Sequence, residues 1–272
     1  MVIDGKKIAS EFIERLKKQG MSKKFLAGFL VGDDSSSESF LKQKEKIAKE
    51  LKVDFRLYRF PESITQDDLR KEILKIAEHK TCGGAIVQLP LPIRINRQYV
   101  LNAIPREKDV DVLGERALGA FYAGRNPVLP PAVGVLDEIL LTTHYSLQTK
   151  KIAIVGLGFL VGKPASVWLK GKCTEIYLLD IGSDFSVLKQ ADLVVLGTGQ
   201  AGLIKSEMLK DDTLVIDFGY GMKDGKISGD FDASSLGIRN SELEISYTPT
   251  PGGTGPILVA KLFENFFKLN LK

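Results

Sequence analysis

The sequence predicts an α/β protein of two α/β lobes, the second of them a Rossmann-type parallel sheet. The chain has 272 residues, more than the roughly 100–150 that one domain usually covers. Strand-like and helical segments alternate, which is typical of parallel βαβ units. A glycine-rich turn also follows an apolar strand in the second half. We expect a first, catalytic lobe of residues 1–133 and 256–272, and a dinucleotide-binding lobe of residues 134–255.

The first half of the chain contains three predicted helices and three predicted strands. Apolar positions three and four apart predict helices at residues 8–18, 39–51 and 65–79, the last with Thr65 as its N-cap. Compact apolar runs or alternating patterns predict strands at residues 24–32, 53–60 and 83–90. The periodicity fails from residue 108 to 133, so we expect a long connecting region there.

The second half begins with a helix at residues 132–144 that leads into the second lobe. Apolar, β-branched runs then predict strands at residues 151–158, 174–180, 191–199 and 213–221. One helix is expected at residues 164–171. Residues 248–256 are rich in proline and glycine and predict a loop before a final amphipathic helix at 257–269.

Composition and charge favour a soluble, cytoplasmic protein that binds a small molecule. Hydrophobic residues make up 44% of the chain, and no apolar run approaches the roughly 18 residues of a membrane span. The net charge is +4, but lysines alternate with glutamates, so we expect no nucleic-acid or membrane partner. The N-terminus lacks the pattern of a secretory signal. Cys82 and Cys173 have the spacing of neither a zinc site nor a redox pair, and we expect no metal.

A dinucleotide site is predicted at the glycine-rich turn "VGLGFLVGKP". Gly156, Gly158 and Gly162 follow an apolar strand and open a helix, although the third glycine comes one residue later than in G-x-G-x-x-G. Glycine permits close approach to a pyrophosphate at the helix N-terminus. Asp180 ends the next strand 24 residues after Gly156, near the position of the acid that binds a ribose 2′-OH. An ordinary strand-to-helix turn is the alternative.

Five motifs in order carry a resemblance to a known family. They are "GDDSSSESFLKQKEK", "VQLPLP", "KDVD", "VGKP" and "TPTPGGTGP". Together they resemble the bifunctional methylenetetrahydrofolate dehydrogenase/methenyltetrahydrofolate cyclohydrolase family over nearly the whole chain. The resemblance implies a folate cleft between the two lobes, a nicotinamide cofactor on the second lobe, and a homodimer. It also implies oxidation of 5,10-methylenetetrahydrofolate by hydride transfer, followed by hydrolysis to 10-formyltetrahydrofolate.

The resemblance assigns roles to residues of the first lobe. Lys44 matches the lysine that handles protons in the hydrolytic step, and Gln88 matches the glutamine beside it. Asp111 matches the carboxylate that binds the pterin. Further substrate-binding matches are Phe40, Leu89, Pro90, Gly253 and Pro256. Further cofactor-binding matches, in addition to the glycine turn and Asp180, are Leu157, Gly199 and Tyr220.

Without the resemblance, each of these residues also has a purely structural interpretation. An exposed helical lysine is usually only solvated, and a glutamine such as Gln88 is common at an exposed strand end. Asp111 could cap its own loop backbone. Pro90 and Pro92 after Gln88 would end sheet pairing in either reading, since proline has no amide hydrogen to donate.

Three departures from the family pattern affect the predicted activity. Phe40 stands where a tyrosine is common beside the lysine, which puts the efficiency of hydrolysis in question. The stretch "LPPAVG" replaces P-C-T-P-x-G. Leu157 lies between Gly156 and Gly158 where the family has G-R-S, and Asp180 replaces a residue of C-H-S. A lost positive charge and a gained carboxylate both disfavour the 2′-phosphate of NADP, so we expect a preference for NAD.

Two other functions are considered. A shikimate-type dehydrogenase has similar length and the same two-lobe plan, but its N-V-T-x-P-x-K stretch is missing from the sequence. A non-catalytic nucleotide-binding relative of the folate enzymes is the other alternative, suggested by Phe40, Leu157 and Pro131. His79 and His144 lie outside the motifs and are expected to be surface helix residues.

Overall fold

The computed structural model describes residues 1–20, 22–223, 225–238 and 245–270. The chain divides into two compact units, which we call unit 1 (Met1–Glu11 and Ala132–Leu258) and unit 2 (Phe12–Pro131 and Val259–Lys272). The division falls inside helix α1 (Gly5–Lys17) and inside helix α8 (Thr254–Asn270).

The first eleven residues are the main difference from the predicted domains, because they group with unit 1 and not with the first lobe. The amide of Ile3 donates a hydrogen bond to the carbonyl oxygen of Tyr247, 2.8 Å away. Ile3 and Ile8 are buried in the core of unit 1. These contacts join residues far apart in the sequence, which a local pattern does not predict.

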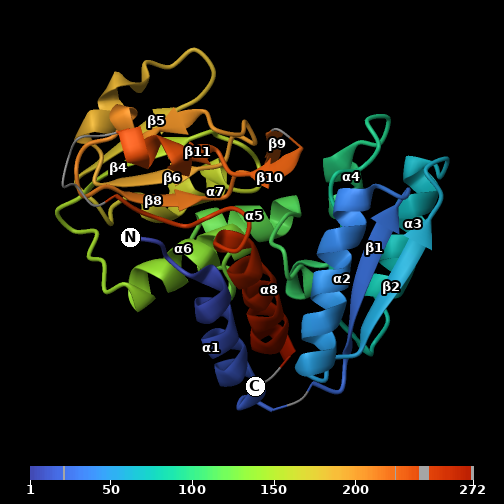
Figure 1. Cartoon of the computed structure of the whole chain (residues 1–272). Coiled ribbons are helices and arrows are strands. Elements are labelled where there is room, and N and C mark those ends of the chain that lie inside the picture. The colour runs from blue at the N-terminus through green and yellow to red at the C-terminus, as the bar shows by residue number, and fades with distance from the viewer. Residues whose placement is uncertain (21, 224, 239–244, 271–272) are drawn as a thin grey trace. The chain divides into compact units, whose positions relative to one another are not determined.

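Unit 2 is built on a parallel sheet of three strands in the order β2-β1-β3. Its strands are β1 (Phe25–Val31), β2 (Phe55–Phe60) and β3 (Cys82–Val87). Helices α2 (Ser35–Glu50) and α3 (Gln66–Ala77) connect them and lie beside the sheet (Figure 1). Thr65 caps α3 by accepting a hydrogen bond from the amide of Asp68, as predicted. Every residue of β1 and β3 is buried, which fits their continuous apolar sequence.

The core of unit 2 also includes helix segments from the two ends of the chain. Phe12 and Leu16 of α1 pack with Phe263, Phe266 and Phe267 of α8 in one buried cluster. The region from 108 to 133, predicted as a connection, contains the short helix α5 (Glu115–Tyr122). Helix α4 (Arg97–Leu101) and the 3₁₀ turn η1 (Arg106–Lys108) were also not predicted. Each is at most two turns long, too short to show a clear helical period.

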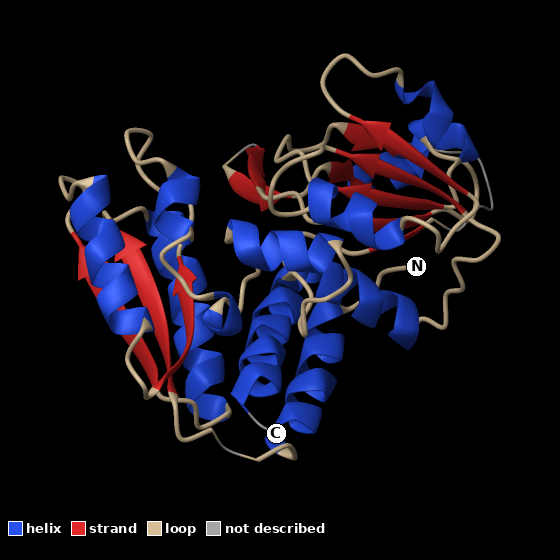
Figure 2. Cartoon of the chain, turned by 180° about the vertical axis from the view of Figure 1, so that it is seen from behind, coloured by secondary structure: helices blue, strands red, loops and turns tan. Residues whose placement is uncertain are grey.

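Unit 1 contains a parallel sheet of five strands in the order β12-β8-β6-β4-β5. The strands are β4 (Lys151–Val155), β5 (Glu175–Leu179), β6 (Leu193–Leu196), β8 (Leu214–Asp217) and β12 (Ser246–Tyr247). Helices α6 (Pro131–Thr142) and α7 (Gly162–Leu169) pack against the sheet (Figure 2). Strand order reverses at β4, because β5 lies on one side of it and β6 on the other. The predicted Rossmann-type sheet is confirmed, and its switch point is the usual ligand position.

Smaller elements complete unit 1. Strands β9 (Gly221–Lys223) and β10 (Lys226–Ser228) pair antiparallel, and β7 (Ile204–Lys205) pairs with β11 (Phe231–Asp232) in parallel. The 3₁₀ turns are η2 (Phe185–Gln190), η3 (Ser206–Met208) and η4 (Ala233–Ile238). The strand predicted at residues 213–221 therefore ends at Asp217, before β9 begins.

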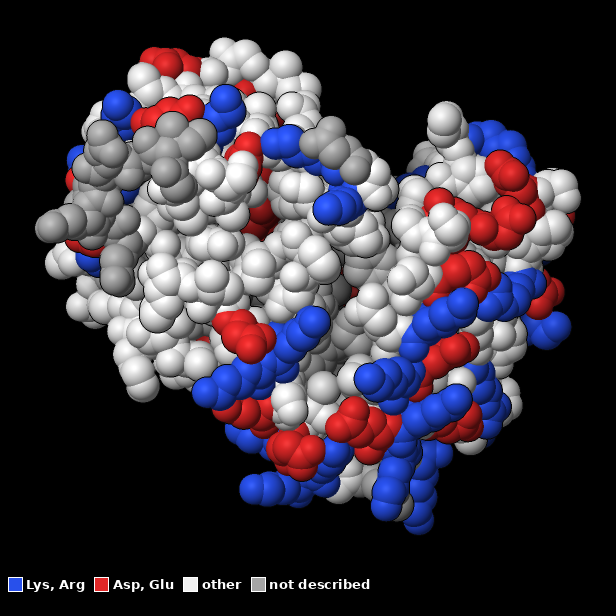
Figure 3. Space-filling view, viewed as in Figure 1, with Lys and Arg blue, Asp and Glu red and all other residues white. Residues whose placement is uncertain are grey.

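Basic and acidic side chains alternate over the helical surface of unit 2 that Figure 3 presents. Lys17 illustrates the pattern, since its ammonium group lies 2.6 Å from Glu14 and 2.8 Å from Glu50. His79 and His144 are exposed, but each follows the end of a helix and does not lie within it. Within the described ranges, no helix is long and apolar enough to cross a membrane, and no His, Cys, Asp and Glu cluster could hold a metal ion.

Candidate active site

Lys44 is a charged residue on the buried face of α2. The helix starts at an N-cap, Asp34, whose carboxylate accepts a hydrogen bond from the amide of Ser37 at 2.8 Å. The buried residues of α2 are Ser37, Leu41, Lys44 and Ala48. Their spacing of three and four places them on one face. Lys44 is only 7% exposed, so the reading of a solvated helical lysine is wrong.

Gln88 lies directly opposite Lys44 at the end of β3. Its backbone amide donates to the carbonyl oxygen of Phe29 at 2.8 Å, so the residue is still attached to β1. Lys44 Nζ donates a hydrogen bond to Gln88 Oε1 at 2.9 Å. Gln88 Nε2 donates to the carbonyl oxygen of Leu89 at 2.8 Å, which turns the amide so that its oxygen faces the lysine. The Leu89–Pro90 bond is cis, and Pro90 itself is exposed.

Asp111 interacts electrostatically with Lys44. Burial lowers the pKa of Lys44, and the negative charge of Asp111 acts in the opposite direction. Burial likewise raises the pKa of Asp111, and the positive charge of Lys44 opposes that shift. The structure therefore brings Lys44, Gln88 and Asp111 together in unit 2. A lysine with a lowered pKa can gain and lose a proton nearer to neutral pH than a solvated one.

Two neighbours of Lys44 on α2 complete this part of the site. Phe40 lies one turn before Lys44 and is partly exposed, so its ring is accessible. Unlike a tyrosine, it has no hydroxyl group. Ser37 lies two turns before Lys44 and was missed by the sequence analysis. Its hydroxyl oxygen is buried and has no hydrogen-bond partner within the described part of the chain. Its spacing of seven from Lys44, which places both on one helix face, is the signal that could have found it.

The glycine turn of unit 1 follows β4 at the switch point of the sheet. Gly156 has a φ of +89°, a conformation that favours glycine. A Cβ atom on Gly162 would lie 2.0 Å from the carbonyl oxygen of Gly156, so a side chain there would collide with the turn. Gly158 is exposed. The N-cap of α7 is Val161, which makes no side-chain capping bond within the described part of the chain. A helix end without such a cap suits an anion, which the backbone amides of the first turn can bind.

The other predicted cofactor residues lie at the same edge of the sheet, and Leu157 follows β4 within the glycine turn itself. Asp180 directly follows β5, Gly199 lies three residues beyond β6, and Tyr220 lies three residues beyond β8. Because these strands are parallel, their carboxyl ends share one edge. The Asp180 carboxylate is exposed and accepts a hydrogen bond from the amide of Ile181 at 3.0 Å. Leu157 instead packs against the apolar core of unit 1.

This arrangement fits a dinucleotide. The close approach of the Gly156 and Gly162 backbones leaves the turn without side chains where a pyrophosphate would lie. Asp180 lies at the end of β5, the strand that pairs with β4. Leu157 is apolar and packs against the core, so its position in the turn carries no positive charge.

Gly253 and Pro256 belong to unit 1, whereas Lys44, Gln88 and Asp111 belong to unit 2. The amide of Gly253 donates to the carbonyl oxygen of Pro249 at 2.7 Å, and a Cβ atom on Gly253 would lie 2.5 Å from that same oxygen. Pro256 lies in the first turn of α8, which begins three residues earlier than predicted. Proline is well tolerated in a first helical turn because the amide there has no partner within the helix.

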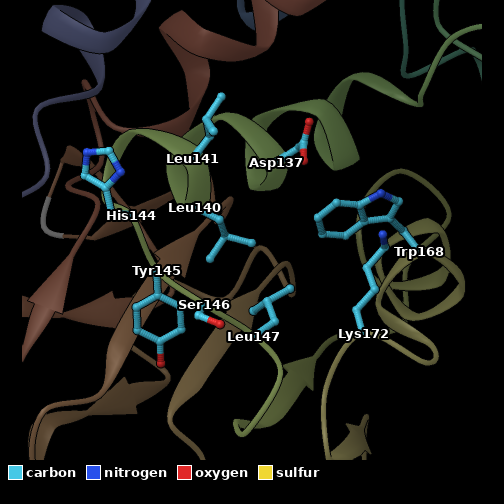
Figure 4. A pocket seen from close by; sticks show the side chains of 9 residues that line it. All are labelled: Asp137, Leu140, Leu141, His144, Tyr145, Ser146, Leu147, Trp168 and Lys172. Atoms are coloured by element: carbon cyan, nitrogen blue, oxygen red, sulfur yellow. The ribbon is translucent and has the colours of Figure 1, made fainter.

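An open pocket of about 460 Å³ lies elsewhere in unit 1, beside α6 and α7 (Figure 4). Its walls are formed by Asp137, Leu140, Leu141, His144, Tyr145, Ser146, Leu147, Trp168 and Lys172. Lys172 Nζ lies 4.9 Å from the centre of the Trp168 ring. All of these residues differ from those predicted to bind substrate or cofactor, so the pocket is separate from the predicted site.

Sequence comparison agrees with this geometry in both units. A family model described as "Tetrahydrofolate dehydrogenase/cyclohydrolase, catalytic domain" matches residues 3–111. A second, described as "Tetrahydrofolate dehydrogenase/cyclohydrolase, NAD(P)-binding domain", matches residues 130–272. The chain belongs to the tetrahydrofolate dehydrogenase/cyclohydrolase family. The bifunctional protein FolD of Bacillus licheniformis is 34% identical over 98% of this chain and 96% of its own length.

Solved structures show the same relationship within the family. The bifunctional FolD methylenetetrahydrofolate dehydrogenase/cyclohydrolase from Campylobacter jejuni is 30% identical, with a TM-score of 0.92 over 99% of this chain and 98% of that chain. The shikimate 5-dehydrogenase of Thermus thermophilus is 9% identical, with a TM-score of 0.54 over 90% of this chain and 93% of that chain. That likeness concerns the fold alone, so the shikimate-type alternative is rejected and the predicted family is confirmed.

Proposed function

We propose that this enzyme oxidises 5,10-methylenetetrahydrofolate to the 5,10-methenyl compound and then hydrolyses that product to 10-formyltetrahydrofolate. Membership of the family supports both activities. The observation that carries the hydrolytic half is the buried hydrogen bond of 2.9 Å from Lys44 to Gln88. A buried amine with a lowered pKa, fixed in orientation by a neutral amide, suits proton transfer at a reacting carbon.

The hydrolytic step needs a proton acceptor and a proton donor. Water forms a C–O bond to the methenyl carbon and loses a proton, which gives a neutral hydroxyl adduct. The hydroxyl of that adduct then loses its proton as the C=O bond forms and the bond from the carbon to N5 breaks. N5 gains one proton, and the other is released to solvent. Lys44 is assigned both roles, because its pKa is lowered by burial and the cationic substrate lowers it further. Gln88 directs the lysine without adding a charge.

Folate binding is assigned to groups around Lys44. The Asp111 carboxylate would accept hydrogen bonds from the ring N–H and amino group of the pterin, and the Phe40 ring would stack on the substrate. Leu89 and Pro90 follow Gln88 and would contact the same ligand. Gly253 and Pro256 are assigned to the substrate from unit 1.

NAD(P) accepts the hydride when it is bound at the glycine turn, and we propose that NAD is preferred over NADP. Gly156, Gly158 and Gly162 would receive the pyrophosphate at the start of α7. Asp180 would bind the ribose hydroxyls and repel a 2′-phosphate. The apolar packing of Leu157 supports this preference, because the position carries no positive charge. Gly199 and Tyr220 are assigned to the cofactor from the same sheet edge.

An absorbance assay tests this function. The enzyme is mixed with methylenetetrahydrofolate and either NAD or NADP, and reduced nicotinamide and the methenyl product are followed separately at neutral pH. Formation of reduced nicotinamide without lasting accumulation of the methenyl compound, beyond its spontaneous hydrolysis, is expected, with higher kcat/KM for NAD. Accumulation of the methenyl compound would mean that the enzyme has only the dehydrogenase activity. No signal with either cofactor would favour the non-catalytic relative.

We also propose that the enzyme is a homodimer, as the family resemblance implies, and that it is cytoplasmic. Light scattering of the purified protein measures the assembly state directly. A mass near twice the 29.9 kDa of one chain is expected, and a monomer at all concentrations would refute the dimer.

A further inference from the structure

Asp109 is a buried carboxylate two residues before Asp111 that the proposed chemistry does not use. It is 2% exposed. One of its oxygens, Oδ2, accepts hydrogen bonds from the amides of Leu113 at 3.0 Å and Gly114 at 2.8 Å. The backbone amide of Val112 also donates to the Asp109 carbonyl oxygen at 3.4 Å, which closes a turn with Val110 and Asp111 in its middle, and the two side-chain bonds hold the residues that follow that turn. The side chain therefore determines the shape of the loop that carries the pterin-binding carboxylate.

The residues on either side of Asp111 are fixed. Val110 is fully buried, and its carbonyl oxygen accepts a hydrogen bond from Asn265 Nδ2 at 2.8 Å. A Cβ atom on Gly84 of β3 would lie 2.7 Å from Val110 Cγ1, so the strand and the loop are in close contact there. Val112 has a φ of +56°, an unfavourable conformation for a β-branched residue. Such a conformation persists only where the surroundings impose it.

Asp109 also connects the loop to the strand that carries Gln88. Its backbone forms a parallel bridge with Ala85 of β3, three residues before Gln88. The same residue thus contacts both segments that carry the partners of Lys44. Its backbone is attached to the Gln88 strand, and its side chain holds the Asp111 turn.

We propose that Asp109 is a positioning residue, which holds the Asp111 carboxylate in place for the pterin and for its electrostatic contact with Lys44. The inference rests on the folate-binding role proposed above for Asp111. Removal of the carboxylate leaves the buried amides of Leu113 and Gly114 without their acceptor. The left-handed conformation of Val112 then loses the support of these two bonds, and the turn relaxes with Asp111 in it.

The protonation behaviour of Asp109 suggests which substitution is conservative. Burial raises the pKa of Asp109 to about 7, and the charge of Asp111 adds to the rise. A neutral side chain with an oxygen in the Oδ2 position is therefore compatible with the turn. Asp109→Asn retains such an oxygen, whereas Asp109→Ala removes it.

The experiment compares Asp109→Ala, Asp109→Asn and Thr65→Ala. Thr65 caps α3 in the same unit, so its loss weakens unit 2 without touching the loop. For Asp109→Ala we expect KM for methylenetetrahydrofolate to rise about tenfold or more, with KM for the nicotinamide cofactor unchanged. The basic pKa of the hydrolysis profile should also fall, because Asp111 raises the pKa of Lys44. Asp109→Asn should restore both readouts, and Thr65→Ala should change neither.

A folded Asp109→Ala enzyme whose kinetics match those of Thr65→Ala would overturn the inference. If Asp109→Ala does not fold, Gly114→Ala decides, because its Cβ atom would lie 3.2 Å from Asp109 Oδ2 and disturb the same contact. A raised folate KM in Gly114→Ala supports the inference, and an unchanged KM refutes it.

A parallel Asp111→Asn variant separates this inference from the role of Asp111 itself. If Asp111→Asn impairs folate binding while Asp109→Ala does not, the positioning role of Asp109 fails and the role of Asp111 stands. If Asp111→Asn leaves folate kinetics unchanged, the proposed role of Asp111 fails, and the positioning role fails with it.

Discussion

The two units of this enzyme use different parts of the chain for their proposed sites. In unit 2 the site consists of side chains, with Lys44 Nζ bonded to Gln88 Oε1 at 2.9 Å near Asp111. In unit 1 it consists mainly of backbone, exposed by Gly156 and Gly162, where a Cβ atom would collide. A site of side chains depends on which functional groups are present. A backbone site depends on glycine, because a larger side chain would block the approach of the ligand to the backbone. The departures at Leu157 and Asp180 lie in the backbone site.

Both units nevertheless share one structural device, a buried carboxylate that organises a loop. Asp109 has this position in unit 2. In unit 1, Asp217 accepts hydrogen bonds from the amides of Gly219 at 2.7 Å and Phe231 at 2.9 Å, and burial raises its pKa to about 7. Asp230 Oδ2 accepts a bond from the amide of Thr198 at 2.6 Å. The units therefore differ in the groups that face the ligands, while their loops are supported in the same way.

The largest effect is expected when the side-chain site loses its amine. Lys44→Met should lower kcat of methenyltetrahydrofolate hydrolysis by about 100-fold or more, since the group that moves the proton is gone. Hydride transfer should fall far less. Lys42→Met, an exposed lysine on the same helix, is the matched control. Equal losses in Lys44→Met and Lys42→Met would contradict the assignment.

A second substitution tests the backbone site. Gly162→Ala would place a Cβ atom 2.0 Å from the carbonyl oxygen of Gly156, so the turn must move. We expect KM for the nicotinamide cofactor to rise by about tenfold or more, while hydrolysis of added methenyltetrahydrofolate is retained. In Gly119→Ala, the new Cβ would meet no described atom within 4 Å beyond its chain neighbours and the nearby backbone of α5, and kinetics should stay as in the wild type. Unchanged cofactor KM in Gly162→Ala would refute a backbone site at this turn.

Cofactor preference should depend on one carboxylate in the backbone site. Asp180→Ser removes a charge that would repel a 2′-phosphate, so the ratio of kcat/KM for NADP to that for NAD should rise about tenfold, or roughly 1.4 kcal/mol. Asp184→Ser, an exposed aspartate four residues later, should leave the ratio unchanged. A wild-type enzyme that already prefers NADP would end the proposal.

The smallest effect concerns the aromatic residue beside the lysine. Phe40→Tyr adds a hydroxyl group one turn before Lys44, and one new hydrogen bond should raise the hydrolysis rate by about two- to tenfold. Phe60→Tyr adds the same group on β2 as a control and should have no effect. If Phe40→Tyr leaves hydrolysis unchanged, the ring contributes through stacking alone.

The regular elements were predicted well where an apolar run had clear ends or where a helical spacing continued over several turns. The strands β1, β3 and β4 are short apolar runs between turns, and α2 and α3 show three- and four-residue spacing with a clear cap at Thr65. Helix α5 has only eight residues and lies among glycines and prolines, so its period was not recognisable. The grouping of Met1–Glu11 with unit 1 depends on contacts to Tyr247, which no local pattern contains.

The same limit applies to the site. The motifs pointed to Lys44 and Gln88 because their types and order are distinctive. Burial, however, is a tertiary property. The spacing of seven from Lys44 could have placed Ser37 on the same helix face, but neither the missing hydrogen-bond partner of its hydroxyl nor the burial of the Asp109 carboxylate can be predicted from sequence alone. Leu157 was assigned to the cofactor by alignment, while in the structure it packs against the apolar core.

The most direct test of the side-chain site is hydrolysis of purified methenyltetrahydrofolate by the wild-type enzyme without any nicotinamide. Loss of the methenyl absorbance is compared with the spontaneous rate in the same buffer, and the dehydrogenase rate of the same preparation is measured separately. We expect catalysed decay to 10-formyltetrahydrofolate. A preparation with an active dehydrogenase that leaves the spontaneous rate unchanged would contradict it, because Lys44, Gln88 and Asp111 would then have no hydrolytic function.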